Sequence, residues 1–359
     1  MTTAKPLPHE ALLNTGHRVL ARNYAPATLG LVRGEGCRVY DACGRSYIDL
    51  GTGISVTSFG HRHPEIDAAV RAQLDRLWHV SNLYYNEPAV QLAVELTECS
   101  FAERVFFCNS GSEANEAAIK LARRAASHHR APDKRVILTF EGGFHGRTLA
   151  AVTATAQPKY HDGFEPLPGG FRYCPFNDIA ALEAAFTDEV CAVLVEPVQG
   201  EGGIVPAAPG FLKRIRELCD ANGALLIADE VQCGLLRTGK LWAHLWDDIR
   251  PDVMTLAKAL GGGLPLGALL VGEAAADILA PGSHGSTFGG NPVVCAGARI
   301  ALHLAQRPAV VGNVLHQGKR FTECLLALKK STGWFSEVRG RGLMLGARVA
   351  DERADQLPD

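Results

Sequence analysis

The sequence predicts an α/β protein with a mostly parallel β-sheet that helices cover on both faces. Three observations predict this fold. From about residue 64 onward, short apolar runs alternate with segments of helical periodicity. The apolar runs lack polar residues at alternate positions, which is typical of parallel strands buried on both faces. Charged and hydroxyl residues follow the ends of several runs, where parallel sheets bind their ligands.

The elements follow in order along the chain. Residues 31–50 predict short paired strands with turns, and a helix is expected over Pro64–Trp78 because proline favours the first helical turn. Further helices are expected after Ser110 and over 210–222. In the helix after Ser110, apolar residues recur at the helical spacing at Ala114, Ala117, Ala118, Leu121, Ala122 and Ala125. The strand-like runs are 104–108, 136–140, 191–195, 224–228, 253–256 and 268–271.

Length and composition indicate an ordinary globular protein. The chain has 359 residues, of which 47% are hydrophobic and 21% charged, enough for a sizeable core and about two domains. The formal net charge is −2, so no basic surface for nucleic acid is expected. No apolar run approaches the roughly 18 residues of a membrane span, and the start of the chain lacks the apolar core of a secretory signal. We therefore expect neither a nucleic-acid nor a membrane partner.

Ten cysteines are present, none of them in a C-x-x-C pair, and several lie within apolar runs, as Cys191 does. This pattern predicts reduced thiols in a cytoplasmic protein rather than a disulfide framework. His61 and His63 are two residues apart, but no nearby cysteine or histidine completes a set of four zinc ligands. No metal site is expected.

Three strand ends carry residues that suit catalysis. Ser110 and Glu113 fit the capping box S-x-x-E, so this segment is either a well-capped helix start or a seat for a phosphate group. Asp229 follows an apolar run, and a carboxylate there needs a partner such as a metal, an arginine or a protonated ring nitrogen. Lys258 follows another run and precedes three glycines. It is either a snorkelling side chain or a partly desolvated lysine that forms a Schiff base.

Taken together, a phosphate seat, a buried acid and a nucleophilic lysine describe a site for pyridoxal 5′-phosphate. The phosphate would bind the helix start at Ser110. Asp229 would keep the pyridine nitrogen protonated, and Lys258 would hold the aldehyde and later move the substrate's proton. These two residues are the predicted catalytic residues.

Six motifs then reveal a resemblance. They are Asn109-Ser-Gly-Ser-Glu-Ala-Asn115, Phe144-His-Gly-Arg147, Glu196-Pro-Val-Gln-Gly-Glu-Gly-Gly203, Asp229-Glu-Val-Gln-Cys-Gly234 with Arg237-Thr-Gly239, Ala257-Lys-Ala-Leu-Gly-Gly-Gly263, and His284-Gly-Ser-Thr-Phe-Gly-Gly-Asn-Pro292. In these motifs and their order, the chain from about Tyr24 to about Ala347 resembles the class III aminotransferases of fold type I, and within them the acetylornithine aminotransferases. The resemblance implies a large domain with a mostly parallel, seven-stranded type of sheet and a smaller α+β domain.

The resemblance also implies residue roles for the cofactor. The phosphate would be held by three residues at the helix start and by Thr287 of a second copy in a homodimer with shared active sites. Phe144 and Val231 would lie on the two faces of the cofactor ring, and Gln232 would bond the ring hydroxyl. The implied cofactor-binding residues are thus Ser110, Gly111, Ser112, Phe144, Asp229, Val231, Gln232, Lys258 and Thr287.

For the substrate, the resemblance implies that Arg147 binds a carboxylate, as a planar guanidinium does well, with Ser286 nearby. Glu201 matches a switch glutamate that masks a second arginine until the dicarboxylic substrate arrives. The implied reaction, a step of arginine biosynthesis, converts N-acetylornithine and 2-oxoglutarate into N-acetylglutamate semialdehyde and glutamate. Succinylornithine and succinyldiaminopimelate aminotransferases are the near alternatives.

Two departures from the family's pattern bear on this reading. Ornithine aminotransferases have a tyrosine where this chain has Ile54, which favours an N-acylated ornithine over free ornithine. Relatives also continue beyond the position of Asp359 and carry the switch arginine there, which Arg341 does not replace. A catalytically impaired cofactor-binding fragment is therefore a further alternative. We expect residues 1–54 and an apparently truncated 291–359 to belong to the small domain, and 55–290 to form the large cofactor-binding domain.

Overall fold

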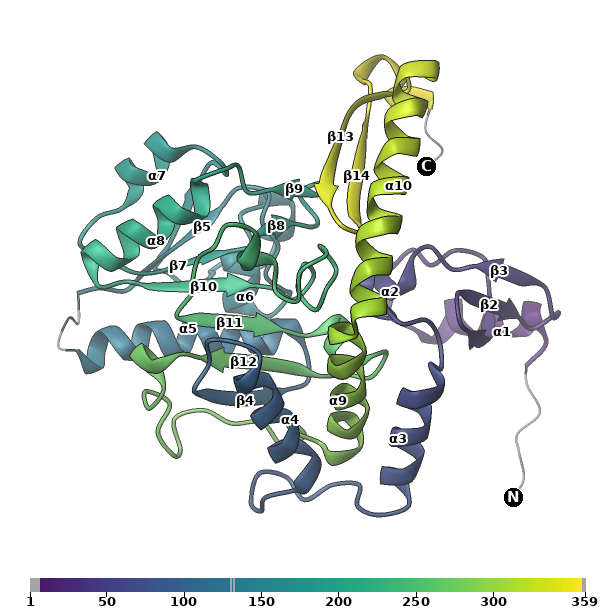
Figure 1. Ribbon diagram of the computed structural model, residues 1–359, viewed down its shortest axis with the longest axis horizontal. Helices are drawn as coiled ribbons and strands as arrows, with labels where there is room; N and C mark the ends of the chain where they lie inside the picture. Colours follow the sequence, from purple (N-terminus) through teal and green to yellow (C-terminus); the bar gives the residue numbers. More distant parts are fainter. Residues whose placement is uncertain (1–6, 130, 132, 357–359) are drawn as a thin grey trace.

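The computed structural model describes residues 7–129, 131 and 133–356, and its centre is a seven-stranded sheet. The strands lie in the order β4–β12–β11–β10–β7–β5–β6 (Figure 1). The neighbours from β11 to β6 are parallel, whereas β12 is antiparallel to both β11 and β4. The bounds are β4 Arg104–Cys108, β5 Val136–Phe140, β6 Phe171–Cys174, β7 Val190–Val195, β10 Leu225–Asp229, β11 Val253–Leu256 and β12 Gly267–Val271. The predicted fold class is confirmed.

Helices cover both faces of this sheet (Figure 1). Every residue of β7 is buried, and its side chains are divided between two cores on the two faces of the sheet. Leu194 packs in a cluster with α5 (Gly111–His128), while Val193 packs in a cluster with α8 (Phe211–Asn222). A strand that must be apolar on both faces has no polar alternation, and this is the pattern that the sequence shows.

The remaining helices and strands flank the central sheet. The N-terminal part holds α1 His9–Val19, the antiparallel sheet of β1 Leu31–Glu35, β2 Arg38–Asp41 and β3 Ser46–Ile48, and α2 Thr52–Ser55. The other helices are α3 Pro64–Leu74, α4 Glu87–Glu98, α6 Leu149–Ala154, α7 Ile179–Ala185, α9 Pro292–Gln306 and α10 Pro308–Thr332. Two short antiparallel pairs complete the fold, namely β8 Val198–Gln199 with β9 Val205–Pro206, and β13 Phe335–Arg341 with β14 Met344–Val349.

The C-terminal hairpin stands apart from the central sheet. The hairpin β13–β14 packs against α10 and projects away from the large sheet, on a different side from β1–β3 (Figure 1). The proposed division of the chain at residues 55 and 290 stays a prediction. In the part of the chain that the structure describes, no helix combines the length and apolarity needed to cross a membrane.

Two local predictions need adjustment. The helix that begins at Pro64 ends at Leu74 rather than Trp78. Side chains replace the helical hydrogen bonds there, since Trp78 Nε1 donates to the Leu74 carbonyl at 2.5 Å and Gln73 Nε2 donates to the Leu77 carbonyl at 2.9 Å. Strand β6 was not predicted, because its sequence Phe-Arg-Tyr-Cys carries polar residues as an edge strand does.

Candidate active site

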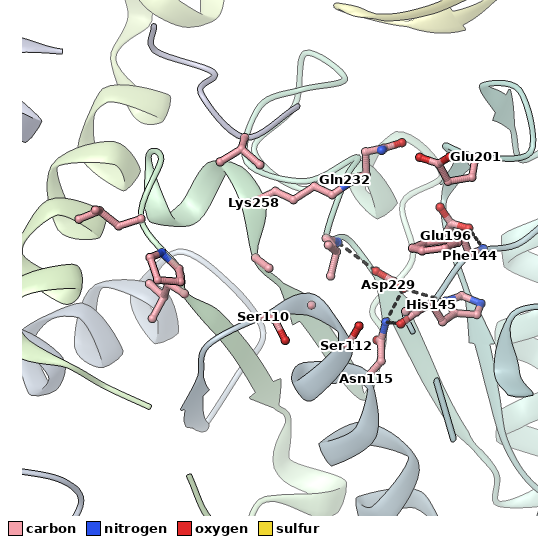
Figure 2. Close-up of a pocket in the computed structure, with 18 of the residues that line it drawn as sticks. Ser110, Ser112, Asn115, Phe144, His145, Glu196, Glu201, Asp229, Gln232 and Lys258 are labelled. Atoms are coloured by element: carbon pink, nitrogen blue, oxygen red, sulfur yellow. Dashed lines mark hydrogen bonds and ion pairs between the residues drawn. The ribbon is translucent and has the colours of Figure 1, made fainter. Parts of the chain in front are cut away.

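A cavity of about 440 Å³ opens where the strands of the central sheet end (Figure 2). It receives side chains from the segments that follow β4, β5, β7, β10 and β11. The lining residues are Val56, Ser110, Gly111, Ser112, Asn115, Phe144, His145, Gly146, Glu196, Glu201, Asp229, Val231, Gln232, Ala257, Lys258, Gly263, Leu264, Pro265 and Leu266. The strand ends therefore meet in one site, as a parallel sheet requires.

Asp229, the last residue of β10, is the centre of a buried hydrogen-bond network (Figure 2). Its side chain is almost inaccessible, and its Oδ2 accepts hydrogen bonds from Asn115 Nδ2 and His145 Nδ1, both at 2.7 Å. Its Oδ1 accepts one from the Val231 amide at 3.0 Å. Asn115 is fixed in turn, because its Oδ1 accepts from Thr255 Oγ1 at 2.8 Å. A carboxylate held from three sides keeps its orientation toward the cavity.

Two further titratable groups lie beside Asp229. Burial would lower the pKa of His145, but the hydrogen bond and charge of Asp229, with Glu196 behind, raise it. Burial raises the pKa of Glu196 to about 7, and its two carboxylate oxygens accept from the amides of Phe144 at 2.9 Å and Gly200 at 3.1 Å. The site therefore holds a protonatable imidazole against a carboxylate in a region from which water is excluded.

The N-terminus of α5 points into the same cavity. Ser110 caps the helix, since its Oγ accepts from the Glu113 amide at 3.2 Å, as the sequence predicts. The Glu113 carboxylate reaches one residue further back than in a standard capping box, to the Asn109 amide at 2.5 Å. A Cβ on Gly111 would lie 2.7 Å from Val231 Cγ1, so this close approach requires glycine. The first amides of α5 have no intrahelical acceptor and suit an anion.

Lys258 follows β11 and faces the acidic groups across the cavity (Figure 2). Burial lowers the pKa of its ammonium group, although Glu201, Asp229 and Glu196 act in the opposite direction. Its backbone has a φ of 44°, in the left-handed region that residues other than glycine seldom adopt. Such strain is often found at functional positions. A partly desolvated lysine is a better nucleophile than a solvated one.

The structure brings together most of the residues that the sequence singled out. The cavity is lined by Ser110, Gly111, Ser112, Phe144, Glu201, Asp229, Val231, Gln232 and Lys258, but not by Arg147, Ser286 or Thr287. Arg147 directly follows the cavity residue Gly146, and its amide donates to Ser112 Oγ at 3.1 Å. Ser286 Oγ accepts from Asn109 Nδ2 at 3.2 Å, and Thr287 is exposed.

Three residues of this site have no role that the sequence alone indicates. Asn115, His145 and Glu196 lie within the quoted motifs, and each is buried in the cavity wall. The available signal was their position at strand ends and on the first turns of α5, where a buried polar side chain needs a partner. His145 and Asp229 are far apart in sequence, so only the fold shows that they are hydrogen-bonded.

Three groups of this site fit pyridoxal phosphate. The N-terminus of α5 suits its phosphate, the buried Asp229 carboxylate suits its ring nitrogen, and Lys258 suits its aldehyde. The buried Oε1 of Gln232 has no hydrogen-bond partner in the described part of the chain, which leaves it free for a ring substituent. The cavity volume of about 440 Å³ also accommodates a small aromatic cofactor.

Arg341 does not take part in this site. Its Nη1 lies 3.1 Å from Asp247 Oδ2, and its guanidinium lies 5.8 Å from the Trp246 ring centroid. Arg341 therefore forms an ion pair with Asp247 outside the cavity. This agrees with the expectation that it is not a partner of Glu201. The Nε2 of His61 lies 2.7 Å from Asp49 Oδ2, so this imidazole pairs with a carboxylate.

Comparison with known proteins agrees with this geometry. The family described as "Aminotransferase class-III" matches residues 19–357. The acetylornithine aminotransferase of Xanthomonas axonopodis pv. citri (strain 306) is 56% identical over 336 residues, which cover 93% of this chain and 82% of that protein. The crystal structure of N-acetylornithine aminotransferase from Stenotrophomonas maltophilia K279a has a TM-score of 0.83 and 46% identity, covering 96% of this chain and 85% of that one.

A more distant relative in sequence is closer in overall shape. The ornithine aminotransferase from Toxoplasma gondii ME49 has a TM-score of 0.93 at 35% identity, covering 98% of this chain and 84% of that one. The match of the family over most of the chain and the convergence of its motifs on one cavity point to the same conclusion. The chain belongs to the class-III aminotransferase family and is a pyridoxal-phosphate-dependent aminotransferase.

Proposed function

We propose that this protein transfers an amino group from N-acetylornithine to 2-oxoglutarate, as a step of arginine biosynthesis. The observation that supports N-acetylornithine as the substrate concerns the segment at the mouth of the cavity. Val56 lines the cavity, and Ile54, two residues before it, is 64% exposed where ornithine aminotransferases have a tyrosine. An isoleucine side chain there cannot accept a hydrogen bond from the charged α-ammonium group of free ornithine, whereas an acylated nitrogen is uncharged and costs less to leave unpaired. The name of the 56% identical relative supports the same substrate.

The residues of the cavity would have different roles in this reaction. When bound, pyridoxal phosphate supplies an electron-withdrawing ring that stabilises negative charge on the substrate carbon. Lys258 would move the proton at the substrate carbon that bears the transferred amino group. Asp229 would hold a proton on the ring nitrogen, with its orientation set by Asn115 and His145. The amides and hydroxyls of Ser110 to Ser112 would bind the phosphate, while Phe144 and Val231 would confine the ring from its two faces.

The experiment that tests this function compares four amino donors with the purified protein and pyridoxal phosphate. N-acetylornithine is expected to give the highest kcat/KM with 2-oxoglutarate, above succinylornithine, succinyldiaminopimelate and free ornithine. A preference for a succinylated donor would replace the proposal with one of its two near alternatives. Bound cofactor without turnover of any donor would indicate a cofactor-binding protein of impaired activity.

Arg147 is proposed to bind the substrate carboxylate. Within the described part of the chain its guanidinium has no hydrogen bond or ion pair, so its donors are available to an anion. Replacing Arg147 with alanine is expected to raise the KM for N-acetylornithine at least about thirtyfold, since losing a charge pair of this kind costs about 2 kcal/mol or more. Cofactor affinity, measured by absorbance titration, should stay the same. An unchanged KM would contradict the assignment.

We also propose that the active protein is a homodimer. Two loops pack against each other, since Asn82 Nδ2 donates to the carbonyls of Ser286 at 2.9 Å and Gly289 at 3.1 Å. Together they expose a patch of large apolar side chains: Trp78, Leu83, Tyr84, Tyr85 and Phe288. An exposed patch of this kind usually contacts another protein, and Thr287 lies within it. A second copy on this patch would bring its Thr287 toward the neighbouring phosphate site.

This dimer can be tested by sedimentation velocity. Tyr85, which is 97% exposed, is expected to anchor the interface, and Tyr85→Lys should raise the dimer dissociation constant at least about thirtyfold. Ile179→Lys on α7, which covers the opposite edge of the sheet, is the matched control and should leave the dimer intact. A wild-type protein that remains monomeric at micromolar concentration would overturn the proposal.

The ten cysteines are all free, and the thiols of Cys108, Cys219 and Cys295 are buried with raised pKa values because burial disfavours the thiolate. We propose a cytoplasmic location, because buried, unpaired thiols suit a reducing compartment.

A further inference from the structure

The Arg147 side chain lies against two aromatic rings. Its guanidinium carbon is 4.1 Å from the centroid of the Tyr160 ring and 5.6 Å from that of Phe144. The two rings meet edge to face, with centroids 5.7 Å apart and planes at 79°. In the part of the chain that the structure describes, the guanidinium has neither a hydrogen bond nor an ion pair. The rings are therefore the contacts that orient it.

Tyr160 is itself fixed to the loop that carries the cavity residue Phe144. It closes the short helix Pro158–Tyr160, and its amide donates to the Gln157 carbonyl at 3.0 Å. Gln157 Nε2 donates to the carbonyls of Gly142 at 3.3 Å and Gly143 at 3.0 Å, directly before Phe144. The ring that contacts Arg147 is thus tied to the backbone that forms the cavity wall.

A guanidinium stacked on a ring uses its face for that contact and keeps its N–H groups, which lie in its own plane, free. Those groups form the fork that binds a carboxylate through two hydrogen bonds. Without the ring, a long and exposed arginine would sample many rotamers and would have to be ordered each time a substrate binds. A second cation, Lys159 Nζ, lies 4.8 Å from the same Tyr160 centroid, so the ring is in an electropositive setting that also favours an anion.

We propose that Tyr160 is a positioning residue for substrate recognition, whose ring holds the Arg147 guanidinium in the orientation that receives the carboxylate of the amino-acid substrate. This inference rests on the proposed role of Arg147 and extends it to a residue outside the cavity. It predicts that the aromatic ring matters and the phenolic hydroxyl does not. It also predicts that Tyr160 acts only on substrates that have this carboxylate.

The test is a double-mutant cycle of Tyr160 and Arg147, in which the measured quantity is the equilibrium dissociation constant of the substrate. Dissociation constants for N-acetylornithine are measured by calorimetry in a cofactor-loaded Lys258→Ala background, where turnover does not interfere. Tyr160→Leu is expected to weaken binding about three- to tenfold, the range of a cation–π contact at a partly exposed site. Tyr160→Phe, which keeps the ring, should restore binding to within about twofold of the parent. In an Arg147→Ala background, Tyr160→Leu should have no further effect.

Two controls separate positioning from general damage. N-acetylputrescine has the same amine and acyl group as N-acetylornithine but no carboxylate, so its dissociation constant should not respond to Tyr160→Leu. Tyr173→Leu perturbs the same neighbourhood, because Tyr173 donates to the Thr153 carbonyl at 2.8 Å and its ring lies 6.0 Å from His161. That variant should bind N-acetylornithine as the parent does.

The outcomes that overturn the inference are distinct from failure of the proposed function. Additive effects of Tyr160→Leu and Arg147→Ala, or equal weakening of N-acetylputrescine, would show that Tyr160 does not act through Arg147. If the wild type prefers another amino donor, the substrate assignment fails. The same double-mutant cycle is then run with that donor and its decarboxylated analogue. It tests the role of Tyr160 independently of the identity of the substrate.

Discussion

Replacing Lys258 with alanine is expected to lower turnover at least about a thousandfold while the protein still binds pyridoxal phosphate. The loss combines the removal of the group that moves the substrate's proton with the removal of the nucleophile that holds the cofactor. Binding should persist because the N-terminus of α5, Gln232 and Asp229 contribute to the cavity independently of the lysine. Absorbance titration of cofactor and steady-state kinetics measure the two properties separately.

Borohydride reduction supplies a chemical test of the same residue. Reduction of the wild-type holoenzyme should attach the cofactor to Lys258, and peptide mapping should find it on no other lysine. Lys240→Ala is the matched control, since Lys240 Nζ donates to the Leu245 carbonyl at 2.7 Å and does not line the cavity. This variant should be labelled at Lys258 as the wild type is. Cofactor found on another lysine would contradict the assignment of Lys258 as the cofactor-binding lysine.

The pKa of Lys258 adds a test that needs no turnover. Burial lowers this pKa, so the neutral amine is populated at a lower pH than in an exposed lysine. In the apoprotein, Lys258 should therefore react with an amine-specific reagent at a pH where exposed lysines are still protonated and inert. Peptide mapping after brief labelling across a pH series would show whether its reaction profile is displaced to the acid side.

The parts of this site that could be predicted are those whose signal is local. Strand β7 reads Val-Cys-Ala-Val-Leu-Val, and a run without polar residues can fold only where both faces are covered. A charged residue at the end of such a run, as Asp229 is in β10, must then lie where the strands of the sheet end. The capping of α5 by Ser110 is also local, because the two partners are three residues apart.

What could not be predicted depends on contacts between distant segments. The hydrogen bond between His145 and Asp229 joins residues that are 84 positions apart. The sequence near His145 therefore does not indicate which residue is its partner. The stacking of Arg147 on Tyr160 likewise depends on the path of the chain through α6. Thr287 is exposed on a single chain, so its expected contact with a phosphate depends on a second copy. Local patterns indicate element types and strand ends, whereas the partners of buried polar groups follow from the fold.

Replacing Asp229 with asparagine is expected to lower kcat by roughly a hundred- to a thousandfold, the usual cost of removing one electrostatic contact that stabilises developing charge. The amide has no negative charge with which to hold a proton on the ring nitrogen. The N-terminus of α5 is untouched, so the phosphate site and the KM should change little. A kcat within about threefold of the wild type would show that Asp229 is not the partner of the ring.

The hydrogen-bond network makes the effect of this variant on folding predictable as well. An amide oxygen can still accept from Asn115 and His145, but the amide NH2 would then face the Val231 N–H, which now donates to Oδ1 at 3.0 Å. Two donors facing each other in a buried site should reduce the free energy of unfolding by about 1–3 kcal/mol. Asp252→Asn is the matched control. That carboxylate pairs with Arg216 at 2.7 Å near the start of β11, away from the cavity.

His145 reports on the same change independently of catalysis. Burial on its own lowers the pKa of His145, and the bond to Asp229 together with its charge reverses that direction. Without the charge the pKa should fall, so the imidazole of the Asp229→Asn apoprotein should become neutral at a lower pH than in the wild type, as histidine NMR signals would show. In Asp252→Asn, unfolding should be easier while kcat per folded molecule and the titration of His145 stay as in the wild type. Loss of kcat in both variants would mean that lowered stability, and not the missing charge, explains the effect at Asp229.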